Sequence, residues 1–365
     1  MEEFGEVLTI LSGDSGDQRA WHSHKATRTL NHVRHGGEVA VIAGGVGAAR
    51  LLRAMHLHDP KARVTALVNT GDDAVVNGLR VSPDLDTVVY TLADEIDPDR
   101  GWGLRDESWI AMRQLSRYAA VRPPASTAPN DWFNIGDRDV ATHLYRTARL
   151  AEGARLSEVT DEIARAWGVG FRVLPMTDDT VSTLVTLAED AAGPDGYRYS
   201  KGETISFQEY FVRLRHSVAI AGVRFAGADT ATVNGLDLLR SAGTVVIAPS
   251  NPVVSVGPVR AMRDVDETLG ARRGSVVAVS PIIGGAALKG PADRMLRELG
   301  MEPSALGVAR LYAGICGTFV IDVVDAHLAT HVEDLGMRCI VTETIMRSDD
   351  IARSLAATVI RAGIG

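Results

Sequence analysis

The feature that most constrains the fold is a short apolar segment followed at once by glycines and a helical stretch. Residues 39–43 (Val-Ala-Val-Ile-Ala) are continuously apolar, as in a strand buried on both faces of a parallel sheet. Gly44-Gly-Val-Gly47 follows, residues 48–55 predict a helix, and residues 64–68 predict a second buried strand. Strand, glycine turn, helix and strand make a βαβ unit, which predicts a right-handed crossover in an open parallel sheet.

Apolar runs of the same kind return late in the chain, at residues 244–248, 275–280, 319–322 and 338–341. Between the two groups, residues 100–180 have a mainly helical pattern. This order predicts an α/β fold: a Rossmann-like, doubly wound, mainly parallel sheet with an inserted helical region. We expect residues 1–37 to form an N-terminal extension that need not be ordered, and residues 38–365 to form a single domain.

Composition narrows the classes of partner. The chain has 365 residues, of which 45% are hydrophobic, and no run approaches the roughly 18–20 apolar residues of a membrane span. A net charge of −8 disfavours a nucleic-acid-binding protein. The two cysteines, Cys316 and Cys339, are too few for a disulfide scaffold or a structural zinc site. We therefore expect a cytoplasmic protein with no membrane and no nucleic acid as partner.

The glycine turn is the first candidate site. Glycines at the start of a helix expose backbone N–H groups, which favours an anionic ligand such as a phosphate, although a plain tight turn has the same spacing. The third glycine of a dinucleotide fingerprint is replaced by Arg50. Asn69, rather than an acidic residue, ends the second strand. An NAD-dependent oxidoreductase is therefore a disfavoured alternative.

Four aspartates follow the second predicted strand: Asp72, Asp73, Asp84 and Asp86. Crowded carboxylates repel one another unless a cation or solvent compensates their charge. Asp84 and Asp86 are two residues apart and would point the same way in an extended segment. Together the four could bind Mg²⁺, which needs few protein carboxylates when substrate phosphates supply other oxygens. Ordinary turn and helix-capping aspartates would explain the same pattern.

Polar groups also gather in three later segments. Residues 135–143 carry Asp137, Arg138 and Asp139 where a helix is expected to start. Residues 174–179 (Leu-Pro-Met-Thr-Asp-Asp) lead toward the aromatic segment 207–213, which we expect to be a strand. The turn Pro249-Ser-Asn-Pro252 offers hydroxyl, amide and backbone donors that suit a nucleotide phosphate, with a rigid β-turn as the alternative.

Taken in order, these segments resemble the 2-phospho-L-lactate transferase family. The resemblance is carried by Gly-Gly-Val-Gly, Val-Asn-Thr-Gly-Asp-Asp, Ser-Pro-Asp-Leu-Asp-Thr, Gly-Asp-Arg-Asp-x-Ala-Thr-His, Pro-Met-Thr-Asp-Asp, Pro-Ser-Asn-Pro-Val and Ser-Pro-Ile-Ile-Gly-Gly. Each motif is modest, but seven in this order are specific, and they cover about residues 38–362. The resemblance implies a Rossmann-like core with a helical insertion, and a homodimer.

The resemblance also implies a reaction, in the biosynthesis of the deazaflavin coenzyme F-420, that requires Mg²⁺. One substrate is Fo, a deazaflavin with a ribityl chain, and the other is a phosphorylated three-carbon acid activated as a GDP derivative. The ribityl hydroxyl attacks the far phosphate and GMP leaves. The glycine loop and Gly101-Trp-Gly103 resemble the phosphoenolpyruvyl type of the family. Phosphoenolpyruvate is therefore the expected acid, with 2-phospholactate and 3-phosphoglycerate as alternatives.

By motif position, the resemblance assigns roles to individual residues. Asp86 and Asp73 are the expected catalytic residues, and the expected metal ligands are Asp72, Asp73, Asp84 and Asp86. The guanine nucleotide is expected at Gly44, Gly45, Gly47, Ser250, Asn251 and Pro252, and Fo at Asp86, Asp137, Met176, Thr177 and Asp178.

A second family with the same core is the main alternative. It binds a sugar nucleotide and regulates cell-wall metabolism without transfer chemistry, and its usual motif is Asp-Asp-Gly-Gly-Ser-Ser-Gly. In this chain Asp72-Asp73 is followed by Ala-Val-Val-Asn-Gly, and then by Pro-Asp-Leu-Asp-Thr. That contrast favours the transferase.

Overall fold

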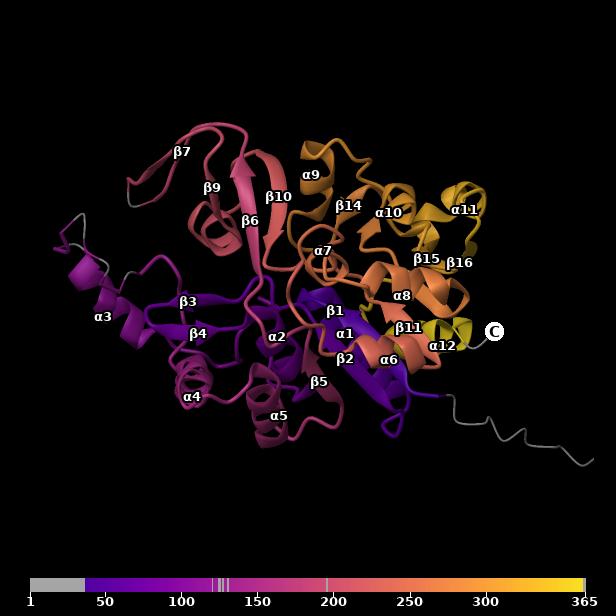
Figure 1. The fold of residues 1–365 in the computed structure, drawn as a ribbon, viewed down its shortest axis with the longest axis horizontal. Helices are drawn as coiled ribbons and strands as arrows, with labels where there is room; N and C mark the ends of the chain where they lie inside the picture. The colour runs from indigo at the N-terminus through magenta and orange to yellow at the C-terminus, as the bar shows by residue number, and fades with distance from the viewer. Residues whose placement is uncertain are drawn as a thin grey trace, which may run out of the picture. The chain divides into compact units, whose positions relative to one another are not determined.

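The computed structural model describes residues 37–363 apart from residues 120, 124, 125, 127, 130 and 195. The expected N-terminal extension, apart from Gly37, lies outside the described residues. Seven strands form one parallel sheet in the order β5-β2-β1-β11-β12-β15-β16 (Figure 1). They are β1 (Val39–Ala43), β2 (Val64–Val68), β5 (Arg172–Pro175), β11 (Thr244–Ile247), β12 (Val276–Val279), β15 (Thr318–Asp322) and β16 (Arg338–Thr342).

The strand order reverses between β1 and β11, because the chain adds β2 and β5 on one side of β1 and the later strands on the other. The register pairs Ile42 of β1 with Ile247 of β11, and Ala43 with Val68 of β2. The carboxyl ends of these three strands therefore meet at one edge, which is the place where doubly wound sheets bind ligands.

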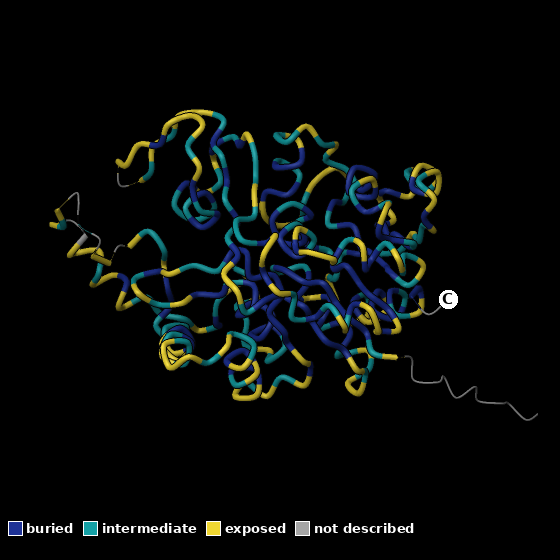
Figure 2. Tube along the Cα trace, in the orientation of Figure 1, coloured by how far each residue is buried: buried dark blue, intermediate teal, exposed yellow. Residues whose placement is uncertain are grey.

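Helices cover both faces of the sheet, which confirms the doubly wound α/β architecture. Side chains alternate along β1, so that Ala40 and Ile42 pack into one apolar cluster and Val39, Val41 and Ala43 into the other. The buried segments gather where the sheet lies (Figure 2). One face carries α1 (Gly45–His58), α2 (Pro83–Leu92), α5 (Leu156–Ala166) and α12 (Asp349–Ala362). The other carries α6 (Leu236–Ser241), α7 (Gly257–Arg260), α8 (Val265–Ala271), α9 (Ala292–Glu298), α10 (Ala305–Tyr312) and α11 (Ala329–Glu333).

The stretch expected to be mainly helical holds α3 (Ile110–Ala119), α4 (Asp139–Ala151) and α5, but also β5, a strand of the main sheet. A hairpin, β3 (Ala74–Val76) and β4 (Leu79–Val81), precedes it in the chain. Val76 and Val81 of the hairpin pack with Met112 of α3, and Figure 1 shows the hairpin next to that helix. No helix among the described residues is long and apolar enough to cross a membrane.

A small antiparallel sheet follows β5. It contains β10 (Ile220–Ala226), β6 (Ser182–Leu187) and β9 (Thr204–Ser206), and two hairpins lie elsewhere, β7 (Ala191–Ala192) with β8 (Arg198–Tyr199) and β13 (Ile282–Ile283) with β14 (Ala286–Ala287).

The expected strand at residues 207–213 is wrong, because Glu209–Arg213 forms a π-helical turn. The Ser206 hydroxyl accepts a hydrogen bond from the Glu209 N–H (3.2 Å) and starts this turn. Phe207 and Tyr210, three residues apart, then bury their rings in one cluster. Two 3₁₀ turns, Arg273–Ser275 and Val323–Leu328, complete the secondary structure of the described residues.

Candidate functional site

The glycine turn and the loop after β11 meet at the reversal point of the sheet. Gly45 opens α1 with a φ of +69°, a conformation that costs least for glycine. A Cβ atom at Gly47 would lie 2.1 Å from the carbonyl oxygen of Pro249. Only glycine therefore lets α1 approach this loop so closely. The N-terminal N–H groups of a 14-residue helix thus lie beside the Ser-Asn-Pro turn, which is an arrangement suited to phosphate.

Asp84 lies against this glycine turn. It belongs to the first turn of α2, and a Cβ at Gly44 would be 2.9 Å from its Oδ2. The Asn69 amide donates a hydrogen bond to Asp84 Oδ2 (2.9 Å) and accepts one from the Gly71 N–H (2.9 Å). Burial raises the pKa of Asp84 to about 6, although hydrogen bonds from Asn69 and the Gly45 backbone oppose the shift. A carboxylate therefore borders the backbone that would hold an anion.

Asp72 is the second buried carboxylate of this cluster. Burial, followed by repulsion from Asp84, raises the pKa of Asp72 well above its usual value. Its Oδ1 has no hydrogen-bond partner among the residues that the structure describes. The Gln208 amide donates to the Asp72 carbonyl oxygen (2.9 Å), and the Thr183 N–H donates to the Gly71 carbonyl (2.7 Å). The antiparallel sheet and the turn that follows it thus close one side of the cluster.

Asp73 has one occupied and one unoccupied oxygen. The Ser82 hydroxyl donates to Asp73 Oδ2 (2.6 Å), whereas Asp73 Oδ1 finds no partner in the described part of the chain. Burial raises the pKa of Asp73 to about 8, and the Ser82 hydrogen bond and the positive charge of Arg146 limit the rise. Asp73 and Asp72 therefore both offer buried oxygens to a further ligand.

Asp86 is held quite differently. Helix α2 turns by about 200° over two residues, so the expectation that Asp84 and Asp86 share a direction in an extended segment is wrong. Arg146 of α4 donates from Nη1 to Asp86 Oδ2 (3.1 Å) and from Nη2 to Asp86 Oδ1. Both side chains are buried. Asp86 is thus part of an ion pair between α2 and the helical insertion.

The buried oxygens of Asp72 and Asp73 could take part in a Mg²⁺ site. Within the described ranges, no group of three or more His, Cys, Asp or Glu side chains could hold a metal ion on its own. Asp72 and Asp73 nevertheless present buried oxygens without hydrogen-bond partners, next to the charge of Asp84. About one or two protein carboxylates suffice for Mg²⁺ when phosphate oxygens and waters complete its coordination. The residues present therefore fit a magnesium ion that is bound together with a phosphorylated substrate.

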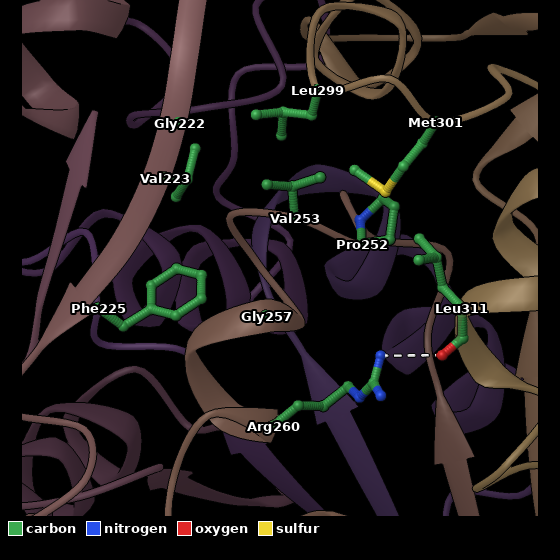
Figure 3. A pocket seen from close by; sticks show the side chains of 10 residues that line it. All are labelled: Gly222, Val223, Phe225, Pro252, Val253, Gly257, Arg260, Leu299, Met301 and Leu311. Carbon is green, nitrogen blue, oxygen red and sulfur yellow. Dashed lines mark hydrogen bonds between the residues drawn. The ribbon is translucent and has the colours of Figure 1, made fainter. Parts of the chain in front are cut away.

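The Ser-Asn-Pro turn has one side chain left for a ligand. Asn251 Oδ1 accepts hydrogen bonds from the N–H groups of Val253 (2.9 Å) and Val254 (3.4 Å), so this amide shapes the turn. Ser250 is buried and its hydroxyl has no partner among the described residues. Pro252 lines the wall of a cavity of about 400 Å³. Figure 3 shows this cavity and its mostly apolar lining, which includes Val253, Phe225, Leu299, Met301 and Leu311.

Asp137, one of the expected Fo contacts, starts a helix in the structure. It accepts a hydrogen bond from the Ser108 hydroxyl (2.5 Å) and from two backbone N–H groups at the start of α3 (2.7 and 3.0 Å). These bonds, led by the one from Ser108, hold the pKa of Asp137 below its usual value. Its contact with Fo stays a prediction.

The segment 176–178 also has internal partners. Met176 is fully buried in the core beneath the sheet, and the buried Thr177 hydroxyl accepts a hydrogen bond from the Asp179 N–H (3.0 Å). Asp178 accepts from the backbone N–H (2.6 Å) and the hydroxyl (3.0 Å) of Ser157 at the start of α5. None of these contacts joins Met176, Thr177 or Asp178 to the aspartate cluster. Their role toward Fo stays a prediction.

The sequence analysis named Asn69 only as the end of the second strand and assigned it no role in the site, and it did not identify Thr183, Ser255 or Arg146. Arg146 had a usable signal, because Asp139, His143 and Arg146 are spaced to share one face of α4. Asn69 had another, since it directly follows β2. No local sequence signal marks Thr183 or Ser255, because only the tertiary fold places them against Gly71 and Gly44.

Comparisons with known proteins give a family match and several similar proteins. Residues 39–357 match the family described as 2-phospho-L-lactate transferase CofD. A phosphoenolpyruvate transferase of Streptomyces griseus is 39% identical over 321 residues, which cover 87% of this chain and 96% of that protein. A phosphoenolpyruvate transferase of Mycobacterium tuberculosis is 40% identical over 311 residues, which cover 81% of this chain and 89% of that protein.

Among solved structures, a Bacillus halodurans protein of the upf0052 family covers 89% of this chain and 99% of its own, with a TM-score of 0.52 and 16% identity. This likeness shows the fold alone.

Proposed function

This chain belongs to the 2-phospho-L-lactate transferase CofD family and is a transferase, and we propose that it acts in coenzyme F-420 biosynthesis. The chain moves a phosphorylated three-carbon acid from its GDP-activated form to the ribityl hydroxyl of Fo. The hydroxyl oxygen forms a bond to the far phosphorus, the bond between that phosphorus and the bridging oxygen breaks, and GMP leaves. The hydroxyl proton is released, and the product is a phosphodiester.

The observation that supports this reaction is the junction at the sheet reversal. Two backbone segments suited to phosphate, the start of α1 and the turn at Ser250, lie together there, next to buried carboxylates. A phosphate and Asp84 would repel each other at the glycine turn unless a cation compensated their charges. A diphosphate bound with a cation therefore suits the site better than a lone anion.

In this proposal each group of residues has a defined task. The glycine turn and Ser250 bind and orient the diphosphate, and Asp72 and Asp73, next to the charge of Asp84, would hold Mg²⁺ together with the phosphate oxygens. When bound, Mg²⁺ neutralises charge on the diphosphate. Phosphoryl transfer depends on positioning and charge neutralisation more than on covalent participation by the protein. Asp86 and Asp73 line the acceptor side, where a carboxylate can orient the attacking hydroxyl.

Phosphoenolpyruvate is the proposed acid. The relatives from Streptomyces griseus and Mycobacterium tuberculosis bear the name phosphoenolpyruvate transferase and match nearly their whole length. The glycine loop of this chain resembles the same type. The homodimer and the cytoplasmic location stay predictions.

A mass spectrum of one reaction tests the proposal. The protein is incubated with Fo, Mg²⁺, GTP and a guanylyltransferase of broad specificity, and with equal amounts of phosphoenolpyruvate, 2-phospholactate and 3-phosphoglycerate. We expect Fo to gain the mass of a phosphoenolpyruvyl group while GMP accumulates, and a reaction without the protein to leave Fo unchanged. Unchanged Fo in the presence of all three activated acids would favour a sugar-nucleotide-binding protein of the related family instead.

A further inference from the structure

Helix α4 carries a buried charge cluster that the proposed reaction does not use. Arg146 is only 2% exposed, which is rare for an arginine unless it is paired. Its two terminal nitrogens both donate to the Asp86 carboxylate, and Nη1 also lies 3.3 Å from His143 Nδ1. A planar guanidinium that forms bidentate hydrogen bonds with a carboxylate fixes the orientation of that carboxylate and compensates its charge.

The cluster continues behind Arg146. His143 Nδ1 faces Arg146 Nη1, so the imidazole ring lies between that guanidinium and Asp139. Nε2 lies 3.3 Å from Asp139 Oδ2, and the Tyr90 hydroxyl donates to Asp139 Oδ1 (2.6 Å). Since Tyr90 and Asp86 belong to α2 and the other three to α4, the chain of contacts returns to the helix from which it starts. Arg146 is therefore fixed between Asp86 of α2 and His143 of α4.

We propose that Arg146 is the positioning residue of this site, and that it holds the Asp86 carboxylate in the orientation needed for attack by the acceptor hydroxyl. This inference rests on the proposed function. Arg146 acts through Asp86, because its side chain is buried and both terminal nitrogens donate to that carboxylate. Each Asp86 oxygen can accept a second hydrogen bond, so the carboxylate can still orient the acceptor hydroxyl. Arg146 thereby makes the helical insertion part of the catalytic arrangement.

Stability alone gives no reason for such a pair. Desolvation of two charges offsets most of their attraction, and well-packed apolar side chains of similar volume often stabilise a core as much or more. Removing one partner, however, leaves an uncompensated buried charge. The pair therefore orients the Asp86 carboxylate more than it stabilises the fold. A double-mutant cycle gives different results for these two roles.

The test compares Arg146→Met, Asp86→Asn and the double variant by steady-state kinetics with Fo and the activated donor. We expect Arg146→Met to lower kcat by about 100-fold, since small misplacements of catalytic groups cost this much. The KM for the donor should stay within about threefold, because the glycine turn that binds the donor is untouched. The double variant should be no slower than Asp86→Asn alone, because Arg146 acts only through that carboxylate.

Two further variants separate positioning from folding. Arg149 lies on the same helix and pairs with Glu162 and Glu152 at the surface, so Arg149→Met is the matched control and should retain normal kcat. Arg146→Lys keeps the charge but loses the bidentate hydrogen bonds, and should recover only part of the lost kcat. Losses in kcat that add in the double variant, or an Arg146→Met variant as active as Arg149→Met, would overturn the inference.

The same variants distinguish this inference from the proposed function. If the wild-type protein yields no product from any donor, the function is wrong. In that case thermal unfolding measures whether Asp86 and Arg146 are coupled at all, and a double variant that is more stable than either single variant confirms the pair. A wild-type protein that transfers normally, together with uncoupled variants, refutes only the positioning role.

Discussion

Asp84 and Asp86 are two residues apart on α2 and lie in opposite surroundings. Asp84 faces the glycine turn, where Asn69 and the Gly45 backbone donate to it and no cationic side chain is among its hydrogen-bond partners. Asp86 faces the helical insertion, where Arg146 donates a hydrogen bond to each of its oxygens. One turn of a helix thus divides the aspartates into a side that is left for a cation and a side that the protein itself neutralises. The variants below test this division.

The largest effect is expected for Asp86→Asn. We expect kcat to fall by about 100- to 10,000-fold, the usual range for a group that handles a proton in the reaction. The variant should also unfold at a lower temperature, because Arg146 would be buried without a charged partner. Steady-state kinetics and thermal unfolding measure the two effects. Asp94→Asn, at an exposed position just after α2, is the control and should match the wild type.

Gly47→Ala tests the other side of the division. The new Cβ would lie 2.1 Å from the Pro249 carbonyl, so α1 and the loop after β11 must separate. Overpacking of this kind destabilises a fold by about 1–3 kcal/mol. We expect affinity for GDP to fall more than affinity for Fo, as measured by calorimetric titration. Gly274→Ala, where a Cβ meets no atom within 4 Å, should change neither affinity, and equal losses for GDP and Fo in Gly47→Ala would contradict the division.

Asp84→Asn should change the Mg²⁺ concentration that the reaction needs rather than the rate at saturating Mg²⁺. Loss of this charge is expected to raise the Mg²⁺ concentration for half-maximal rate by about 10- to 100-fold, the usual effect of a residue that supports a metal site. At saturating Mg²⁺ most of the wild-type rate should return. Magnesium titrations of Asp84→Asn and Asp86→Asn, run side by side, measure the difference. A similar shift in both variants would mean that Asp86 is a metal ligand despite its pairing with Arg146.

The smallest effect is expected for Thr183→Val. The Thr183 hydroxyl is buried beside Gly71 and lies close enough to the Asp72 carboxyl to lower its pKa, but it makes no hydrogen bond of full geometry in the described part of the chain, so its loss should destabilise the protein little. If the hydroxyl faces the bound diphosphate, affinity for GDP with Mg²⁺ should fall by about threefold to tenfold, the value of one hydrogen bond. Denaturant unfolding and GDP titration check both statements. Unchanged GDP affinity would remove Thr183 from the site.

The main sheet could be predicted because its signals are local. β1 and β11 are runs of apolar residues next to glycine or proline, and such runs form buried parallel strands wherever their partners lie. β5 was not predicted because its four residues, Arg172–Pro175, follow helices and contain only a short apolar run. The segment at Phe207 was wrong because two buried rings fit a helical turn as well as a strand.

The aspartate cluster could be located from the sequence, but the different surroundings of Asp84 and Asp86 could not be predicted. Ser82-Pro83 is a typical helix start, and with that signal Asp84 and Asp86 separate onto different faces of α2. The partner of Asp86 is 60 residues away on another helix, and no local pattern joins the two. The partners of Asp137 and Asp178, at the starts of α3 and α5, are non-local for the same reason.

The most direct test of the division is a set of four calorimetric titrations. GDP with Mg²⁺ and Fo are each titrated into Asp84→Asn and Asp86→Asn, with the wild type as reference. The account predicts that Asp84→Asn loses affinity for GDP with Mg²⁺ and keeps its affinity for Fo, whereas Asp86→Asn shows the reverse. Loss of the same ligand in both variants would contradict it, because the two carboxylates would then serve one subsite.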